Sequence, residues 1–424
     1  MNRKKKLPIG MASFEGIIRD GRTYVDKTEL MWKMIELSKY IFLSRPRRFG
    51  KSLLVTTLRA YFEGKRELFE GMKITELEKE WIPYPVIRLD LSLAKARNTA
   101  EELRNALAWI IEPYEELYGK NESNMMPGER LNSIIKKAFE QTGKQVVLLV
   151  DEYDAPMLDV VDEDKKLGDF RQVMQEFYMP LKASEDYIKF CFITGITKFS
   201  QLSIFSTINN LANISLLPEF ATICGITEEE LEGQLADFVE DMAAALECSS
   251  QKMLDKLRER YDGYHFANNS QGVYNPFSLI NALMMKSLNN YWFSSGTPTF
   301  LIKKLREFNT DASALEGVEV VAEAFDLPTE ALTDALPLLY QSGYLTIKDY
   351  NPTELTYTLG IPNQEVRIGL SKGLLPTYTS LDQINNKGYA LPYATSGKKV
   401  VKVGIEFDPD AMTAKNWVVS NSSS

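Results

Sequence analysis

The stretch from Phe42 to Leu58, which reads F-L-S-R-P-R-R-F-G-K-S-L-L-V-T-T-L, decides the fold. Apolar residues 40–43 predict a short strand, and the helical spacing of Leu54, Leu58 and Tyr61 predicts a helix. Between them lies a loop that ends in Gly-Lys-Ser. This combination is typical of a phosphate-binding loop, because backbone N–H groups and the helix dipole both favour a bound phosphate.

The loop is expected to hold a nucleotide. Lys51 would reach the outer phosphates, and the Ser52 hydroxyl would bind Mg²⁺. One position departs from the pattern G-x-x-x-x-G-K-[ST], because Arg45 stands where the first glycine is expected. The alternative is a basic turn before a buried helix, and Arg47 and Arg48 could clamp phosphate, contact a neighbouring subunit or lie in solvent. The predicted nucleotide-binding residues are Arg45, Pro46, Arg47, Arg48, Phe49, Gly50, Lys51, Ser52 and Leu53.

A second motif lies well downstream. Residues 146–150 form a continuous apolar run, as expected of a strand buried on both faces, and the run ends in Asp151-Glu152. Asp151 is expected to bind the Mg²⁺ that Ser52 also contacts, and Glu152 to orient and polarise the attacking water. A surface turn after a core strand explains Asp151 alone, but not the acidic pair together with Gly-Lys-Ser. The two motifs together predict a core that binds ATP or GTP.

Composition restricts the function further. The 424 residues carry a formal net charge of −9, with 44% hydrophobic and 25% charged residues. This is a globular composition, and the length suits about two to four domains. The negative charge disfavours a broad nucleic-acid-binding surface but leaves a local basic patch open. No apolar run approaches the ~18 residues of a membrane span, so we expect no contact with a membrane.

The cysteines and the histidine point to no metal site. Cys191, Cys224 and Cys248 lack the spacing of metal ligands, and the first two are expected in the core. The lack of a disulfide framework fits a reducing cytoplasm, and the basic residues 3–6 are not followed by the apolar segment of a leader. His265 is the one histidine, so a site built from several histidines is excluded, and a structural role is expected for it.

Strands and helices alternate through the first half of the chain. Further strands are predicted at 86–91, 188–193 and 221–226, with amphipathic helices between them. The alternation predicts an α/β fold, a parallel sheet with helices on both faces. Ligands of such sheets lie outside the carboxyl ends of the strands, where Thr194 also falls. Thr194 is predicted to report the state of the terminal phosphate through its hydroxyl, with a capping or turn role as an equal alternative.

The second half becomes helical. Helices are predicted at 231–246, 251–261, 276–288, 299–307 and 332–342. The last one runs into two strands, 343–347 and 355–359, which resemble the end of a winged helix. Such a module can bind DNA or act as a lid, and the acidic Asp349 and Glu354 favour the lid. The predicted units are 1–230, 231–375 and 376–424.

Seven short stretches make the chain similar to the bacterial AAA-ATPase-like proteins. They are L-P-I-G, Y-V-D-K-T, R-P-R-R-F-G-K-S-L, V-D-E-Y-D-A-P, T-G-I-T-K-F-S, Y-D-G-Y-H-F and V-Y-N-P-F-S, and they fall within residues 7–375. In that family a loop with Arg45 in place of glycine is normal. The resemblance implies a P-loop NTPase with a winged-helix-like C-terminal part. It also implies that Lys51 and Ser52 bind phosphate and Mg²⁺, that Asp151 binds Mg²⁺ and that Glu152 activates water.

The chain departs from that family at its C-terminal end. Family members commonly carry a nuclease-like domain of the PD-(D/E)-x-K type, and residues 388–394 and 400–407 resemble only its last piece. The Glu-x-Lys that such nucleases use beside a metal does not occur after residue 345. We interpret 376–424 as a remnant left by an internal deletion and expect no nuclease activity. Its apolar side chains, Val401, Val403, Ile405 and Trp417, would then pack on the helical module or on another chain.

Three functions fit these residues. The first is a cytoplasmic protein that binds ATP and hydrolyses it with Mg²⁺ to drive a conformational switch, with Glu152, Lys51 and Thr194 as catalytic residues. The second is a nucleotide-dependent interaction or signalling module with little or no hydrolysis, and the third is a DNA-processing accessory protein. Glu152 favours the first, because binding alone does not need it. ATP rather than GTP rests on the resemblance, and the partner could be a second copy or another protein.

Overall fold

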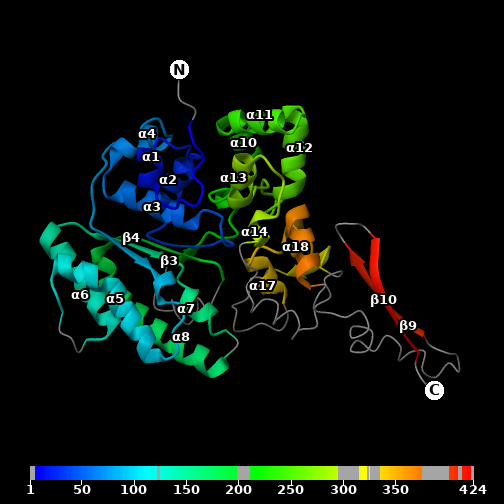
Figure 1. The fold of residues 1–424 in the computed structure, drawn as a ribbon. Coiled ribbons are helices and arrows are strands. Elements are labelled where there is room, and N and C mark those ends of the chain that lie inside the picture. The colour runs from blue at the N-terminus through cyan, green and yellow to red at the C-terminus, as the bar shows by residue number, and fades with distance from the viewer. Residues whose placement is uncertain are drawn as a thin grey trace.

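The structure is a computed structural model, and it describes residues 5–121, 125–161, 163–197, 211–294, 315–321, 324, 335–374, 401–408 and 413–421. The described chain has three parts: a sheet covered by helices, a mostly helical module and a C-terminal hairpin (Figure 1). The helix expected at 299–307 and the tail segment 382–389 lie outside the described residues.

A five-stranded parallel sheet positions the site. The strand order is β2-β3-β4-β1-β5, so β4 lies between β1 and β3. The carboxyl ends of β1, β4 and β3 are therefore neighbours, which brings together segments that are far apart in sequence. The strands are β1 (Tyr40–Ser44), β2 (Val86–Asp90), β3 (Val146–Asp151), β4 (Ile188–Gly195) and β5 (Leu211–Asn213). The predicted α/β fold is confirmed.

Both faces of the sheet are buried. Ile41 and Leu43 of β1 belong to one hydrophobic cluster, whereas Tyr40 and Phe42 belong to another. Successive strand residues point to opposite faces, so strands buried on both sides need continuous apolar runs. In Figure 1 helices α1 to α4 lie on one side of the sheet, and α5, α6 and α8 on the other. Their bounds are α1 (Phe14–Arg19), α2 (Thr28–Leu37), α3 (Lys51–Phe62), α4 (Ile74–Leu77), α5 (Ala100–Tyr118), α6 (Pro127–Thr142) and α8 (Asp164–Tyr178).

Short helical segments connect these elements. They are η1 (Arg66–Phe69), η2 (Leu91–Ala94), α7 (Ala155–Leu158), η3 (Met179–Tyr187) and η4 (Pro218–Phe220). Two of them follow the carboxyl ends of strands. Segment η2 begins directly after β2, and α7 begins four residues after β3 ends.

The strand expected at 221–226 is wrong. Residues 221–225 form turns after η4, and the fifth strand is the three-residue β5 instead. Gly225 has a φ of 99°, which is the left-handed region, and a Cβ built on it would meet Val273 at 2.6 Å. The apolar run is therefore buried as a loop that packs tightly on the helical module, and only Ile226 forms an isolated bridge, to Tyr274.

The described part of the second half is mostly helical, but the helix predicted at 231–246 is divided into α10 (Glu228–Gln234) and α11 (Ala236–Ala245). Helix α10 begins with a capping box, because the Thr227 hydroxyl accepts from the N–H of Glu230 and the Glu230 carboxylate accepts from the N–H of Thr227. Asn275 caps α13 and is followed by Pro276. The bounds are α10 (Glu228–Gln234), α11 (Ala236–Ala245), α12 (Ser250–Tyr261), α13 (Pro276–Met285), α14 (Tyr291–Ser294), α17 (Leu336–Gln341) and α18 (Gln364–Leu374).

Helix α17 is followed by the expected pair of strands. β7 (Thr346–Asn351) and β8 (Thr356–Gly360) form an antiparallel sheet with β6 (Val318–Val321), which the sequence did not suggest, in the order β6-β8-β7. The assignment of α17, β7 and β8 to a winged helix stays a prediction. This module shares one hydrophobic cluster with α3, since Leu58 and Trp292 both belong to it. The module and α3 therefore belong to the same hydrophobic core.

The C-terminal hairpin is formed by the last two described strands. β9 (Val401–Asp408) and β10 (Thr413–Asn421) are antiparallel, and Ile405 lies opposite Trp417. Figure 1 shows the hairpin apart from the helical module, so the expected packing on that module is not seen among the described residues. Its identity as a nuclease remnant stays a prediction. None of the described helices is long and apolar enough to cross a membrane.

Candidate functional site

The phosphate loop leads from β1 into α3. The backbone N–H of Arg45 donates to the carbonyl of Gly195 on β4 at 3.2 Å, so the loop begins as an extension of the sheet. Gly50, the N-cap of α3, has a φ of 91°, and no atom lies within 4 Å of the Cβ that another residue would add. Conformation rather than crowding therefore requires glycine there. Arg45 is not among the residues with positive φ, so its backbone does not need the glycine of the usual pattern.

Lys51, which is predicted to reach the outer phosphates, is buried. Its Nζ donates to the carbonyls of Arg45 and Pro46, at 2.9 Å each, and its exposed fraction is 6%. Burial lowers the pKa of Lys51, and the nearby carboxylates of Asp151 and Asp154 oppose that shift. The ammonium group is thus held by the loop's own carbonyls, where a phosphate could replace them.

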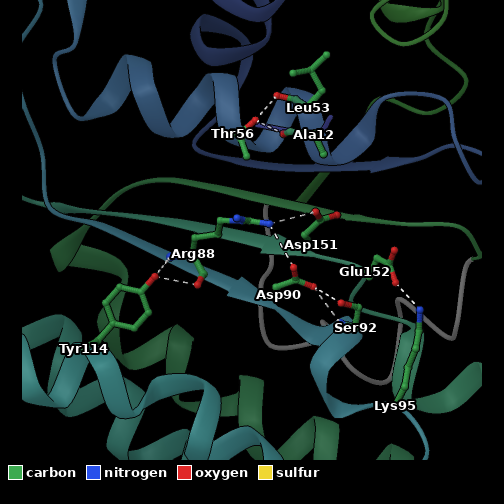
Figure 2. Close-up of polar contacts among 10 residues, drawn as sticks. All are labelled: Ala12, Leu53, Thr56, Arg88, Asp90, Ser92, Lys95, Tyr114, Asp151 and Glu152. Carbon is green, nitrogen blue, oxygen red and sulfur yellow. Dashed lines mark hydrogen bonds and ion pairs between the residues drawn. The ribbon is translucent and has the colours of Figure 1, made fainter. Parts of the chain in front are cut away.

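Asp151 is the last residue of β3, and its carboxyl group lies near the Ser52 hydroxyl. Burial raises the pKa of the Asp151 carboxyl, and the nearby Ser52 hydroxyl and Lys51 ammonium act in the opposite direction. Its Oδ2 is 3.9 Å from the guanidinium of Arg88, while its Oδ1 is buried without a hydrogen-bond partner among the described residues. Figure 2 shows Arg88 reaching both Asp151 and Asp90, which are paired across β2 and β3.

Glu152 is the next residue and has a different environment. Its carboxylate accepts from the ammonium of Lys95 at 2.6 Å, and both side chains are about one-third exposed (Figure 2). Glu152 has a φ of 50°, which is uncommon for a residue other than glycine and is found mostly at turns and functional sites. Lys95 follows η2 and was not predicted from the sequence, because no motif surrounds it.

Asp154 fixes the end of β4. Its Oδ2 accepts from the N–H groups of Ile196 and Thr197 and from the Thr197 hydroxyl, at 2.7–2.9 Å. Asp154 is fully buried, and burial raises the pKa of its carboxyl. A Cβ at Gly195 would lie 2.5 Å from Asp154 Oδ1, so this strand end needs glycine. The sequence motif contained Asp154, but no role was assigned to it.

Thr194 is placed differently from the prediction. Its hydroxyl donates to the carbonyl of Leu43 at 2.7 Å, and its side chain is fully buried between β4 and β1. The residue three positions later, Thr197, lines the cavity instead. This geometry favours the alternative role for Thr194, a structural one, and gives its hydroxyl no contact with the cavity.

A cavity of about 490 Å³ opens in front of the loop. It is bounded by the N-terminal segment 8–12, by the loop and the start of α3, by the pair Lys95 and Glu152, and by the helical module. The predicted nucleotide-binding residues that line it are Arg47, Arg48, Gly50, Lys51, Ser52 and Leu53. The module contributes Pro276, Phe277, Ile280, Asn281, Trp292, Ser342 and Tyr344.

Three of the predicted nucleotide-binding residues, Arg45, Pro46 and Phe49, do not line this cavity. The Arg45 guanidinium is buried and donates to the carbonyls of Ser44, Ser215 and Phe220. Its burial lowers the pKa of Arg45. Pro46 and Phe49 are also buried and pack on the module, where the Phe49 ring lies 4.8 Å from that of Tyr264. These residues support the loop from behind and do not contact a ligand in the cavity.

The module contacts the loop at three consecutive residues. Trp292 Nε1 donates to the carbonyl of Arg47 at 3.2 Å, and the Arg48 guanidinium lies 4.0 Å from the ring centre of Phe277. A Cβ at Gly343 would lie 2.8 Å from Pro46. The sequence offered no signal for these contacts, because they join residues more than 200 positions apart.

A smaller apolar cavity of about 90 Å³ adjoins the first. The two share Pro8, Gly50, Leu53, Pro276 and Ile280 as lining residues. Its position, between the N-terminal segment, the start of α3 and α13, suits a flat apolar group attached to a phosphate chain.

The residues present fit a magnesium ion. Mg²⁺ prefers oxygen ligands and keeps several waters, so one or two protein oxygens and the substrate phosphates suffice. The Ser52 hydroxyl and Asp151 Oδ1 are such oxygens, and the unpartnered buried Oδ1 is the atom that a cation would satisfy. Among the described residues no group of three or more His, Cys, Asp or Glu side chains is arranged to hold a metal without such help.

The chain is similar to a protein family, to a relative over most of its length and to a solved structure. A family described as "Predicted AAA-ATPase" matches residues 8–205. An uncharacterized protein in the vnfD 5' region of Azotobacter chroococcum mcd 1 is 34% identical over 384 residues, which cover 88% of this chain and 71% of that protein. The structure of Drosophila ORC bound to GC-rich DNA and Cdc6 has 10% identity and a TM-score of 0.26, and the match covers 69% of this chain and 45% of that one. At that TM-score the structural likeness carries no argument.

Proposed function

This chain belongs to the family of predicted AAA-ATPases, and from that premise we propose that it binds ATP with Mg²⁺ and hydrolyses it to drive a conformational switch. One observation carries the proposal. Lys51 and Ser52 at the start of α3, and Asp151 and Glu152 at the end of β3, meet across β4 at one edge of the sheet. These are the residue types that phosphoryl transfer to water requires.

Binding would begin with an exchange of partners at Lys51. The ammonium group leaves the carbonyls of Arg45 and Pro46 and contacts the outer phosphates, which are stronger acceptors because they are charged. The N–H groups at the start of α3 and the exposed guanidinium of Arg47 supply further donors. Ser52 and Asp151 would hold Mg²⁺, which neutralises phosphate charge when bound.

Hydrolysis would use Glu152. Its carboxylate lines the cavity and is exposed enough to accept a hydrogen bond from a water molecule in line with the terminal phosphate. Water attacks the γ-phosphorus, ADP leaves, and the proton of the water passes to the carboxylate. The Lys95 ammonium contacts one of the two carboxylate oxygens and stabilises the unprotonated carboxylate, so the ion pair opposes this proton transfer.

The base would occupy the smaller apolar cavity. Its lining is predominantly apolar and continuous with the phosphate-facing cavity through Gly50 and Leu53. Tyr24 lines that cavity and would contact the base there. Asp26 is not available in the same way, because its carboxylate accepts from Thr28 and from the N–H of Lys73.

The switch would be the helical module. Trp292 and Phe277 contact Arg47 and Arg48, so a phosphate that draws these arginines into the cavity changes the module's contacts as well. ATP and ADP then stabilise different arrangements of the module by their differential contacts with the loop.

A second candidate has one observation in its favour. The Lys95–Glu152 ion pair holds the expected water-activating group, and a protein that keeps this pair when ATP is bound would act as a nucleotide-dependent interaction module with slow hydrolysis. Phosphate release separates the two functions. We expect Mg²⁺-dependent release by the wild type and none by Glu152→Gln, which still binds ATP. Wild-type release no faster than that of Glu152→Gln, with ATP bound by both, supports the interaction module.

A further inference from the structure

A buried carboxylate in the module lies behind the cavity wall. Glu365, in the first turn of α18, is fully buried. Its Oε2 accepts from the hydroxyl of Ser278 at 2.7 Å, and its Oε1 accepts from the backbone N–H of Trp292 at 2.8 Å. Among the described residues no cation forms an ion pair with it. Burying a carboxylate without a cation is costly, so its two hydrogen bonds must be specific.

The two donors belong to the two helices that touch the phosphate loop. Trp292 is on α14, and its own indole donates to the carbonyl of Arg47. Ser278 is on α13, directly after Phe277, whose ring lies against the Arg48 guanidinium. A single carboxylate on a third helix therefore connects the α13 and α14 contacts to the loop.

Two polar residues near the carboxylate donate to other groups. Arg260 on α12 is turned to Gln364 and Asn290, to which it donates at 2.9 and 2.7 Å. Tyr261, also on α12, donates to the carbonyl of Asn289. The side-chain donors of Arg260 and Tyr261 are thus directed mainly to groups other than Glu365.

We propose that Glu365 is a positioning residue of the nucleotide site, whose carboxylate holds Trp292 and Phe277 against Arg47 and Arg48. The inference rests on the proposed function, because it concerns how the wall of the same cavity is fixed. Glu365 does not line the cavity and touches no substrate. Without it, the α13 and α14 walls lose a shared anchor, and the loop arginines lose the surface that orients them.

Variants can separate hydrogen bonding from volume. Glu365→Gln keeps both partners, because the amide oxygen can accept from Trp292 and the amide N–H can donate to the Ser278 hydroxyl. Glu365→Leu has a similar volume and offers neither contact. Glu316→Gln is the matched control, since Glu316 pairs with Arg367 on the same helix at 2.9 Å but reaches neither the loop nor the cavity.

The test measures the Kd of ATP with Mg²⁺, together with KM and kcat, at a temperature where circular dichroism shows each variant folded. We expect Glu365→Leu to raise Kd and KM by about tenfold, a loss equal to one or two hydrogen bonds. We expect kcat at saturating ATP to change less, and Glu365→Gln and Glu316→Gln to stay within about twofold of the wild type. A purely structural role would lower the melting temperature without changing Kd in the folded protein.

Three outcomes overturn the proposal. Glu365→Leu could bind ATP as tightly as the wild type, or Glu365→Gln could lose as much affinity as Glu365→Leu. If Glu365→Leu does not fold, Ser278→Ala removes one of the two contacts and decides instead: an unchanged Kd rejects the anchor, and a rise of a few fold supports it. A wild type that binds no ATP is the third outcome, and it rejects the proposed function as well.

Discussion

The indole nitrogen of Trp292 lies 3.2 Å from the carbonyl oxygen of Arg47, so the helical module donates a hydrogen bond to the phosphate loop itself. The two residues are separated by 245 positions in the chain. A loop that is fixed in this way from outside the sheet responds to the module, and the module responds to whatever the loop binds. Reciprocity of this kind follows whenever one element contacts both sites.

Removing this hydrogen bond should weaken nucleotide binding. Trp292→Phe keeps an aromatic ring in the wall but loses the Nε1 donor, and the net value of one hydrogen bond corresponds to a rise in the Kd of ATP of about fivefold. Trp109→Phe is the control, because Trp109 is exposed on α5, away from the cavity. Titration of both variants with a fluorescent ATP analogue decides it, and equal affinities for the two would contradict the coupling.

The ion pair between Lys95 and Glu152 predicts a brake on hydrolysis. Lys95→Gln removes the ammonium that occupies the Glu152 carboxylate, so kcat for ATP should rise by about two- to fivefold, since an exposed pair of this kind contributes less than about 1 kcal/mol. Thermal unfolding should change little for the same reason. A kcat that falls would show that Lys95 helps the reaction, for example by contacting phosphate, and would reject the brake.

Replacing Arg45 and replacing Arg47 should have opposite effects on stability and on ATP binding. Arg45→Gln leaves buried carbonyls of Ser215 and Phe220 without their donor, and we expect a loss of about 2–4 kcal/mol in unfolding free energy. Arg47 is exposed in the cavity, so Arg47→Gln should leave stability almost unchanged but weaken ATP binding. Denaturant unfolding and ATP titration of both variants test this pair. The reverse result would make Arg45 the phosphate ligand that the sequence pattern suggested.

The buried Glu365 should make stability depend on pH. Burial raises the pKa of Glu365 from 4.5 to about 7, so the folded protein binds a proton more tightly than the unfolded chain does. Its contribution to stability is complete below pH 4.5 and is lost as the pH rises to about 7, at most about 3 kcal/mol. The unfolding free energy of the wild type minus that of Glu365→Gln should therefore fall between pH 5 and 8. A flat difference would contradict the burial.

Short-range sequence patterns predicted the α/β fold and the position of part of the phosphate loop. The strand at 40–43, the start of α3 at Lys51 and the end of β3 at Asp151 each carry a signal in a few adjacent residues, because apolar runs and helix starts are set locally. The parallel order then brings Lys51 and Asp151 to one edge of the sheet without further information.

The rest depends on contacts that no local pattern encodes. Thr194 fits the sequence expectation of a strand-end hydroxyl, but the register of β4 on β1 turns the hydroxyl to the carbonyl of Leu43. Arg45 stands in the motif as a candidate ligand, yet its long side chain reaches carbonyls near η4. Lys95 and Glu365 have no motif at all, and only the packing of distant segments gives them partners. The 221–226 segment is apolar like a strand and is buried as a loop instead.

The central claim is that Lys51, Ser52 and Asp151 together bind ATP with Mg²⁺. Calorimetric titration of the wild type with ATP, with and without Mg²⁺, tests it most directly, with Lys51→Met and Asp151→Asn in parallel and GTP as the competing nucleotide. The account predicts binding by the wild type that tightens with Mg²⁺, a loss of binding of at least about a hundredfold in Lys51→Met, and retained binding without the Mg²⁺ effect in Asp151→Asn. No ATP binding by the folded wild type, or equal binding by folded Lys51→Met, would contradict it.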